Sequence, residues 1–277
     1  MAEETKLIII MAGLPGKMAT AAAEKILEQK DMTLYSLALT GNIKEEKTKI
    51  KDTEVTLVKP GRHDYTLEDV LGKGKVILVD YSQPDAVNKN AELYRDHRIP
   101  FVMGTTGGDR KALEKVVSSS DISAVIAPNM AKQIVGFQAM MQYAADNFPD
   151  LFKDYRLEIT ESHQQEKKDT SGTAKAMVSY FNKLGIPFTT EQIGMIRDPN
   201  NQRSIGVSEE HLSGHGWHTY ALKSKDGTVL FQFVHNVNGR DIYADGTLDA
   251  IRFLNKKFYI EENKGKVYSM IDVLKGQ

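Results

Sequence analysis

The chain has 277 residues, enough for one large domain or two modest ones, and we expect two. Its 36 lysine and arginine residues balance 37 acidic residues, which excludes the basic surplus of a nucleic-acid binder and favours a small-molecule partner. The absence of cysteine excludes disulfides, thiolate metal sites and cysteine nucleophiles.

The N-terminal sequence and the hydropathy pattern indicate no export or membrane signal. Met1–Thr5 is acidic and leads directly into an apolar run, unlike a signal peptide or an arginine-rich transit peptide. No apolar run approaches the roughly 20 residues that a membrane-spanning helix needs. We therefore expect a cytoplasmic protein without a membrane partner.

The first half of the chain alternates strand and helix patterns. Apolar runs predict strands at 7–12, 34–39, 76–79, 100–103 and 124–127, and helices are predicted up to Leu27, at 84–97 and at 110–117. This alternation predicts an α/β fold, a parallel sheet with helices on both faces. Ligands of such sheets bind beyond the carboxyl ends of the strands, so the candidate sites are 13–18, 81–84, 104–107 and 128–130.

The turn after the first strand is a shortened relative of the dinucleotide-binding fingerprint, and it consists of Gly13, Leu14, Pro15, Gly16, Lys17 and Met18. Small residues there let a pyrophosphate approach the helix amides, although two glycines would also suit a tight turn without a ligand. The second strand leads to Thr40, where an NAD-preferring site has Asp or Glu. With Lys17 and Lys44 nearby, NADPH is the expected cofactor, and NADH remains possible.

A second glycine pair, in Gly104-Thr105-Thr106-Gly107, follows the strand that ends at Met103. The glycines would permit close approach of a flat ring. On local grounds the segment could equally be the cap of the helix that begins after Asp109.

From Met130 onward the pattern indicates a different architecture. It predicts a long amphipathic helix at 132–148, a strand at 155–159, a helix at 173–181 and a hairpin of strands 219–224 and 228–234 around an Asp-Gly turn. We therefore expect an α+β unit with a mostly antiparallel or mixed sheet. The polar segment 199–204 is predicted to be a mobile loop, 246–257 a helix and 267–274 a strand.

The segment 161–174 carries the residues best suited to catalysis. His163 lies where a strand gives way to a loop, and its imidazole could deliver a proton near neutral pH, assisted by Lys167. Ser171, Gly172 and Thr173 open the next helix, whose unpaired amides attract a carboxylate or phosphate. The alternative is an ordinary serine cap beside an exposed histidine.

A metal site is a rival interpretation, because His211, His215 and His218 could join His163. It is disfavoured because no carboxylate stands at ligand spacing from them and because the segment 213–218 is typical of a turn that enters a strand.

Five motifs together resemble the dihydrodipicolinate reductase family of the diaminopimelate route to lysine. They occur in that family's order and spacing at 13–18, 104–107, 127–130, 161–174 and 235–246. The resemblance implies a Rossmann-type dinucleotide-binding domain over 1–130 and 246–277. It also implies a central domain over 131–245 that binds a dicarboxylate substrate and builds the interface of a homodimer or homotetramer.

The resemblance further implies a reaction, in which hydride passes from NAD(P)H to the substrate ring. His163 corresponds to the proton donor and Lys167 to a second catalytic position that also contacts a substrate carboxylate. Positions implied to bind substrate are Gln164, Ser171, Gly172 and Thr173. Positions implied to line the nicotinamide pocket are Gly104, Thr105, Thr106, Ala127, Pro128, Asn129 and Met130.

Two departures from the commoner bacterial pattern resemble the plant-type branch of this family. The usual His-His pair is His163-Gln164 here, and a residue pair before Ser-Gly-Thr is shortened to Thr170. A processed plant protein would reside in the plastid stroma. The alternatives that remain are another two-domain NADP-dependent oxidoreductase and a non-catalytic NADP(H)-binding sensor.

Overall fold

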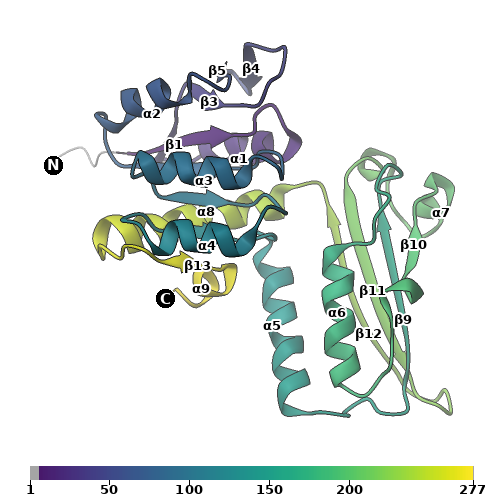
Figure 1. Ribbon diagram of the computed structural model, residues 1–277. Coiled ribbons are helices and arrows are strands. Elements are labelled where there is room, and N and C mark those ends of the chain that lie inside the picture. Colours follow the sequence, from purple (N-terminus) through teal and green to yellow (C-terminus); the bar gives the residue numbers. More distant parts are fainter. Residues whose placement is uncertain (1–5, 277) are drawn as a thin grey trace. The chain divides into compact units, whose positions relative to one another are not determined.

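The computed structural model describes residues 6–276, which form two compact units (Figure 1). The first unit combines the chain up to Lys132 with the chain from Asp241 onward, and the second unit spans Gln133–Arg240. No helix among the described residues is long and apolar enough to cross a membrane.

The first unit contains a parallel sheet that ends in one antiparallel edge strand. Its nine described strands follow the order β13-β8-β7-β6-β1-β3-β5-β4, with β2 also paired to β1, and only β4 is antiparallel to its neighbour. The strands are β1 Leu7–Ala12, β2 Met32–Leu34, β3 Leu37–Leu39, β4 Lys47–Ile50, β5 Thr53–Val58, β6 Val76–Asp80, β7 Phe101–Met103, β8 Ala124–Ile126 and β13 Val267–Tyr268. β1 reads as a continuous apolar run because it is buried in the middle of this sheet.

Helices complete the first unit and cover its sheet (Figure 1). They are α1 Lys17–Leu27, α2 His63–Leu71, α3 Val87–Asp96, α4 Arg110–Ser118, α8 Asp241–Asn255, a π-helical turn at Lys256–Ile260, and α9 Met270–Lys275. Apolar side chains of α2, α3 and α4 share one core with the sheet, while α1 packs against α8. The α/β class and the Rossmann-type sheet predicted from the sequence are confirmed.

The second unit has a four-stranded mixed sheet in the order β10-β9-β11-β12. Its strands are β9 Arg156–His163, β10 Gly194–Ile196, β11 His215–Lys223 and β12 Leu230–Asn238, and only the β10–β9 pair is parallel. Two helices, α5 Lys132–Asn147 and α6 Gly172–Lys183, pack their apolar residues with Ile159, Tyr220 and Leu222 of the sheet. Short helical turns at Thr190–Gln192 and Glu209–His211 complete the unit together with α7 Pro199–Ser204.

Three local predictions were wrong. The segment predicted to be a mobile loop is α7 Pro199–Ser204, because the Asp198 side chain accepts hydrogen bonds from two amides of its first turn. The strand predicted at 267–274 ends at Tyr268, because Ser269 forms a capping box with Asp272 and starts α9. The strand predicted at 34–39 is two short strands, β2 and β3.

Candidate functional site

The glycine turn after β1 lines a cavity of about 410 Å³. Gly13, Leu14, Pro15, Gly16 and Thr40 contribute to it together with Asn42, His63, Tyr81, Ser82 and Gln83. No side chain among the described residues caps the start of α1, and its first turn has no acid. The amides that begin with Lys17 and Met18 are therefore left for an anion, as a dinucleotide pyrophosphate requires.

Internal hydrogen bonds and tight packing fix the shape of this turn. Gly13 has a φ of +102°, and a Cβ there would lie 2.4 Å from the carbonyl oxygen of Tyr81, so only glycine fits. The buried Thr40 hydroxyl donates to the carbonyl of Leu14 at 2.8 Å. The Thr40 hydroxyl thus holds the turn, and the cofactor contact of Thr40 stays a prediction.

The Gly104–Thr106 segment packs on the turn after β6. A Cβ on Gly104 would lie 2.3 Å from the ring of Tyr81, and the Thr105 hydroxyl donates to the Ser82 carbonyl at 3.0 Å. Asp80 is fully buried and accepts hydrogen bonds from the Ser82 amide and from the side chains of Asn90 and Tyr94. A network of buried polar groups therefore determines the shape of this segment.

The Ala127–Met130 segment links β8 to α5. The Ala127 amide donates to the Met103 carbonyl, and the Asn129 side chain accepts from the Ala131 amide. Pro128 is exposed and lines a separate cavity beside β13, whereas Met130 is buried. This segment and Gly104–Thr106 lie outside the lining of the 410 Å³ cavity.

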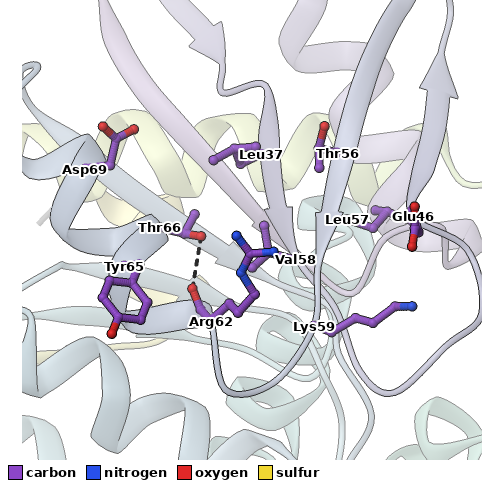
Figure 2. A pocket seen from close by; sticks show the side chains of 10 residues that line it. All are labelled: Leu37, Glu46, Thr56, Leu57, Val58, Lys59, Arg62, Tyr65, Thr66 and Asp69. Carbon is purple, nitrogen blue, oxygen red and sulfur yellow. Dashed lines mark hydrogen bonds between the residues drawn. The ribbon is translucent and has the colours of Figure 1, made fainter.

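A further cavity of about 440 Å³ lies between β5 and α2 (Figure 2). The segment 58–63 serves both cavities, because Pro60 and His63 line the first while Lys59 and Arg62 line the second. Among the described residues, the side chains of Arg62 and Lys59 form no ion pair. Glu46 and Asp69 line the same cavity, so its lining carries charges of both signs.

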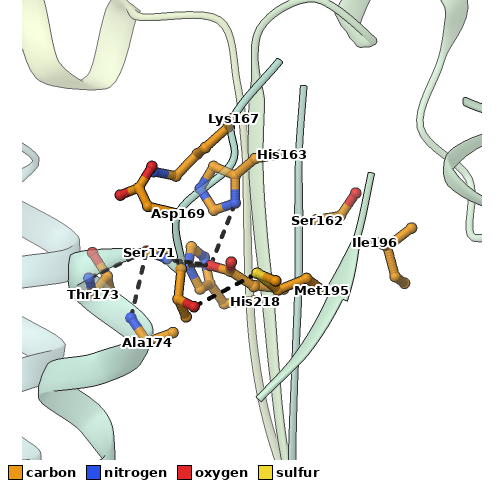
Figure 3. Close-up of polar contacts among 12 residues, drawn as sticks. Ser162, His163, Lys167, Asp169, Ser171, Thr173, Ala174, Met195, Ile196 and His218 are labelled. Atoms are coloured by element: carbon orange, nitrogen blue, oxygen red, sulfur yellow. Dashed lines mark hydrogen bonds and ion pairs between the residues drawn. The ribbon is translucent and has the colours of Figure 1, made fainter. Parts of the chain in front are cut away.

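In the second unit, β9, the following loop and α6 bring the predicted catalytic residues together (Figure 3). His163 is the last residue of β9. Ser171 is the N-cap of α6 and accepts from the amides of Thr173 and Ala174 at 3.2 and 3.4 Å. Lys167 forms an ion pair with Asp169 at 2.9 Å.

Two further predicted substrate contacts are neighbours of these residues in the sequence, since Gln164 follows His163 and Gly172 follows Ser171. The half-buried Gln164 accepts the Lys167 amide through its backbone carbonyl. A Cβ placed on Gly172 would meet no atom within 4 Å. The start of α6 is therefore open to a ligand at Gly172.

A buried carboxylate, Glu161, organises this site. Its Oε1 pairs with Nη2 of Arg197 at 2.6 Å, and its Oε2 accepts from the Ser171 amide at 2.9 Å. The same Oε2 lies 3.5 Å from Nδ1 of His163 and 3.7 Å from Nε2 of His218. The sequence analysis gave no role to Glu161, although it lies in the quoted segment, and no local signal marked Arg197.

Both histidines beside Glu161 are uncharged at neutral pH. Burial, and after it the positive charges of Arg197 and Lys167, lower the pKa of His163 to about 3. Burial and the neighbouring His235 lower the pKa of His218 to about 2. The substrate-free site therefore holds a neutral imidazole next to Lys167, suited to receive a negatively charged ligand.

Metal-ligand atoms of Glu161, His163 and His218 lie within 4.8 Å of one another. No carboxylate stands at ligand spacing from His211, His215 and His218 in the sequence, but in the fold Glu161 supplies one to His163 and His218. Arg197 already neutralises that carboxylate, so the charge balance suits an anion better than a cation. His215 takes no part, because its Nε2 bonds to the Ser162 hydroxyl.

Comparisons with known proteins are consistent with this arrangement. Residues 7–130 match the family model described as dihydrodipicolinate reductase, N-terminus, and residues 134–274 match that described as dihydrodipicolinate reductase, C-terminus. A relative from Oryza sativa subsp. japonica, named probable 4-hydroxy-tetrahydrodipicolinate reductase 1, chloroplastic, is 46% identical over 96% of this chain and 78% of its own length. 4-Hydroxy-tetrahydrodipicolinate reductase 2, chloroplastic, from Arabidopsis thaliana is also 46% identical, over 96% of this chain and 77% of its own.

A solved structure supports the fold. Dipicolinate-bound dihydrodipicolinate reductase from Paenisporosarcina sp. TG-14 superposes with a TM-score of 0.65, covering 96% of this chain and 98% of that chain. The two sequences are 19% identical, so this likeness concerns the fold alone.

Proposed function

Because the chain belongs to the dihydrodipicolinate reductase family and acts as a nicotinamide-dependent 4-hydroxy-tetrahydrodipicolinate reductase of lysine biosynthesis, we propose that its second unit binds the substrate and supplies the proton. The observation that carries this proposal is the convergence of His163, Lys167 and the start of α6. The first unit then binds the dinucleotide at the turn after β1.

The substrate carries two carboxylates and therefore needs two anion sites. One carboxylate binds the α6 start at Ser171, Gly172 and Thr173, where Gly172 is open to a ligand and the amides of Ser171 and Thr173 donate within the protein. The other carboxylate takes the place of Asp169 and forms the ion pair with Lys167. The Gln164 side chain is a further polar contact, which donates a hydrogen bond without carrying charge.

Reduction of the ring by hydride requires one proton, and we assign its delivery to His163. Its pKa is low in the free protein because burial and two nearby cations oppose protonation. Two substrate carboxylates offset those cations, so the His163 pKa rises when substrate binds. His163 then takes up a proton and donates it to the ring.

The dinucleotide is NADPH in preference to NADH. Thr40, and no acid, stands directly after β3, so no carboxylate at that position repels a 2′-phosphate. Lys59 and Arg62 line the adjoining cavity, and Lys17 and Lys44 are close in the sequence to the glycine turn and to Thr40. Gly104–Thr106 and Ala127–Met130 are the proposed lining of the nicotinamide pocket.

Turnover is tested by following NADPH oxidation with freshly generated product of dihydrodipicolinate synthase. The expected result is oxidation that depends on both the synthase product and the protein. NADPH binding without oxidation would favour the alternative of a sensor. Oxidation with another carbonyl or imine substrate alone would favour a different two-domain oxidoreductase.

We propose a homodimer or homotetramer that forms through the uncovered face of the second unit's sheet. On that face the side chains of Leu230 and Val234 are 59% and 54% exposed. Thr219 of β11 lies directly opposite Val234 in the sheet. Light scattering of the purified protein tests the assembly. Val234→Asp is expected to yield a smaller species, and a monomeric wild type would contradict the proposal.

The relatives from Oryza sativa subsp. japonica and Arabidopsis thaliana are named chloroplastic, and we propose the plastid stroma as the location if the source is a plant, and the cytoplasm otherwise. A fluorescent fusion to the complete gene product, imaged in the source cells, tests this location. Signal in any other compartment would contradict it.

A further inference from the structure

Glu161 and Arg197 form a buried ion pair, which makes hydrogen bonds to the backbone of the segment that runs from Lys167 to Ser171. The Glu161 side chain is fully buried and that of Arg197 is 17% exposed, with 2.6 Å between Oε1 and Nη2. Neither group is expected to touch the substrate, since the carboxylate faces the protein interior and would repel an anionic ligand. Their function must therefore be sought in the groups that they hold.

Arg197 holds the backbone of the loop that carries Lys167. Its Nε donates to the Lys167 carbonyl at 2.7 Å and its Nη2 to the Asp169 carbonyl at 3.3 Å. Its Nη1 donates to the carbonyl of Ile196, which anchors the guanidinium to β10. The planar guanidinium thus fixes the backbone on both sides of Lys168 through carbonyl oxygens, and the ammonium of Lys167, whose partner is the exposed Asp169, takes no part in these bonds.

Glu161 holds the other end of the same loop. Its Oε2 accepts from the Ser171 amide at 2.9 Å, and Ser171 caps α6. The two proposed carboxylate contacts, Lys167 and the start of α6, are therefore tied to one ion pair. The loop between them, 164–170, is otherwise exposed or half-buried.

We propose that Glu161 and Arg197 are positioning residues, which set the distance and orientation between the two substrate carboxylate sites. This inference rests on the proposed roles of Lys167 and of Ser171–Thr173. A dicarboxylate ring is rigid, so a shift of either site weakens binding at both.

The pair also sets the charge around His163. The charged or titratable groups that face its ring are Glu161, Lys167, Asp169, Arg197, His215 and His218. Burial is the largest cause of the lowered pKa of His163 and the charge of Arg197 is the next, so removal of Arg197 raises that pKa. A role in folding alone would not shift a pH profile in this direction.

The test compares Arg197→Met and Glu161→Gln with the control Arg203→Met. Arg203 lies six residues further on, in α7, and its ion pair with Glu209 is largely exposed. Amide hydrogen exchange over 164–171 is expected to quicken by roughly fivefold or more in the two test variants. Exchange that stays at the wild-type rate in both would overturn the proposal, whether or not the protein turns over substrate.

Binding and catalysis give the functional readout. Dipicolinate serves as the dicarboxylate probe, and its Kd is expected to rise by about tenfold or more in both variants, with NADPH affinity unchanged. In the pH profile of kcat/KM, the limb that reports the pKa of His163 is expected to move to higher pH in Arg197→Met and to stay in place in Arg203→Met. Faster loop exchange with unchanged dipicolinate affinity would overturn the link between the pair and substrate binding.

Arg197→Lys keeps the charge and changes the geometry of the hydrogen bonds, so it separates the two effects. It also replaces Arg197→Met in the test if that variant does not fold. A lysine keeps the charge but cannot bond the Lys167 carbonyl and Glu161 in one plane, so dipicolinate affinity stays low. Full recovery of affinity in Arg197→Lys would overturn the geometric role.

Discussion

His218 Nε2 and Ser171 Oγ lie 2.9 Å apart, and their hydrogen bond ties β11 to the start of α6. Ser171 Oγ already accepts from two helix amides, so the proton of its hydroxyl goes to His218. His218 is uncharged at neutral pH and can accept it. Because the amides of Ser171, Thr173 and Ala174 already donate within the protein, the Gly172 amide is the one among residues 171–174 that is left for the substrate, while Ser171 maintains the geometry of the helix start.

Ser171→Ala is expected to lower the stability of the second unit by about 1 kcal/mol through loss of the cap, and to weaken dipicolinate binding. Urea unfolding followed by fluorescence checks the stability, because the single tryptophan, Trp217, lies in β11 of this unit. Ser179→Ala, at an exposed position of α6, is the matched control. Equal midpoints for the two variants would contradict the capping role.

Acid is expected to destabilise the second unit through histidines whose pKa values burial lowers, with the largest effects at His163 and His218. The folded-state pKa values of His163 and His218, about 3 and about 2, lie below the ordinary value of 6.5. The unfolded chain therefore takes up protons below pH 6.5 that the folded chain does not, and stability falls as the pH drops from 6.5 towards 3.

The slope is at most about 1.4 kcal/mol per pH unit for each histidine. Urea unfolding between about pH 7 and about pH 5 measures it, again by Trp217 fluorescence. His218→Phe removes one titrating group and should flatten the dependence. An identical slope in the wild type and His218→Phe would show that His218 is not responsible.

Local signals in the sequence predicted most of the elements. The apolar run at Leu7–Ala12, the turn at Asp226-Gly227 and the cap at Ser171 each act within a few residues, and the structure confirms the strand, the hairpin and the helix start. The caps at Asp198 and Ser269 are local signals too. At 199–204 the polar composition predicted a loop in spite of the cap at Asp198, and at 267–274 the apolar run predicted a strand in spite of the cap at Ser269.

The interior of the site could not be predicted in the same way. Arg197 is 36 residues from Glu161 along the chain, and only the parallel pairing of β10 with β9 brings them together. The pairing of His218 with Glu161 across β11 and β9 likewise depends on sheet register. Because tertiary pairing creates these contacts, neither spacing nor composition of a single sequence reveals them.

His163→Ala and Lys167→Ala are each expected to lower turnover by roughly 100- to 10,000-fold, because they remove the proposed proton donor and a substrate carboxylate partner. NADPH affinity should stay unchanged, since the dinucleotide cavity lies in the first unit. Steady-state kinetics and NADPH titration measure both quantities. Lys168→Ala, exposed on the same loop, is the control, and undiminished turnover in either test variant would remove that residue from the catalytic assignment.

Arg62→Ala is expected to weaken NADPH binding by about tenfold and to leave NADH binding unchanged, since only NADPH carries the 2′-phosphate. Arg62 lines the cavity that adjoins the dinucleotide site. Paired titrations of both cofactors measure the effect, with Lys111→Ala on α4 as the control for a lost surface charge. Equal weakening for NADPH and NADH would place the 2′-phosphate elsewhere.

Gly172→Ala separates the ligand site from the stability of the fold. The added Cβ meets no protein atom within 4 Å and the backbone there does not require glycine, so stability should change by no more than about 0.5 kcal/mol. The same methyl group projects into the space proposed for a substrate carboxylate. The KM for substrate and the Kd of dipicolinate should therefore rise while the urea midpoint stays.

Gly104→Ala is the contrasting control, because its Cβ would lie 2.3 Å from the Tyr81 ring and force the first unit to adjust. It should impair cofactor binding and leave dipicolinate affinity unchanged. If Gly172→Ala binds dipicolinate as tightly as the wild type, the carboxylate does not approach α6 at Gly172, and Lys167 would be left as the principal anion contact of the second unit.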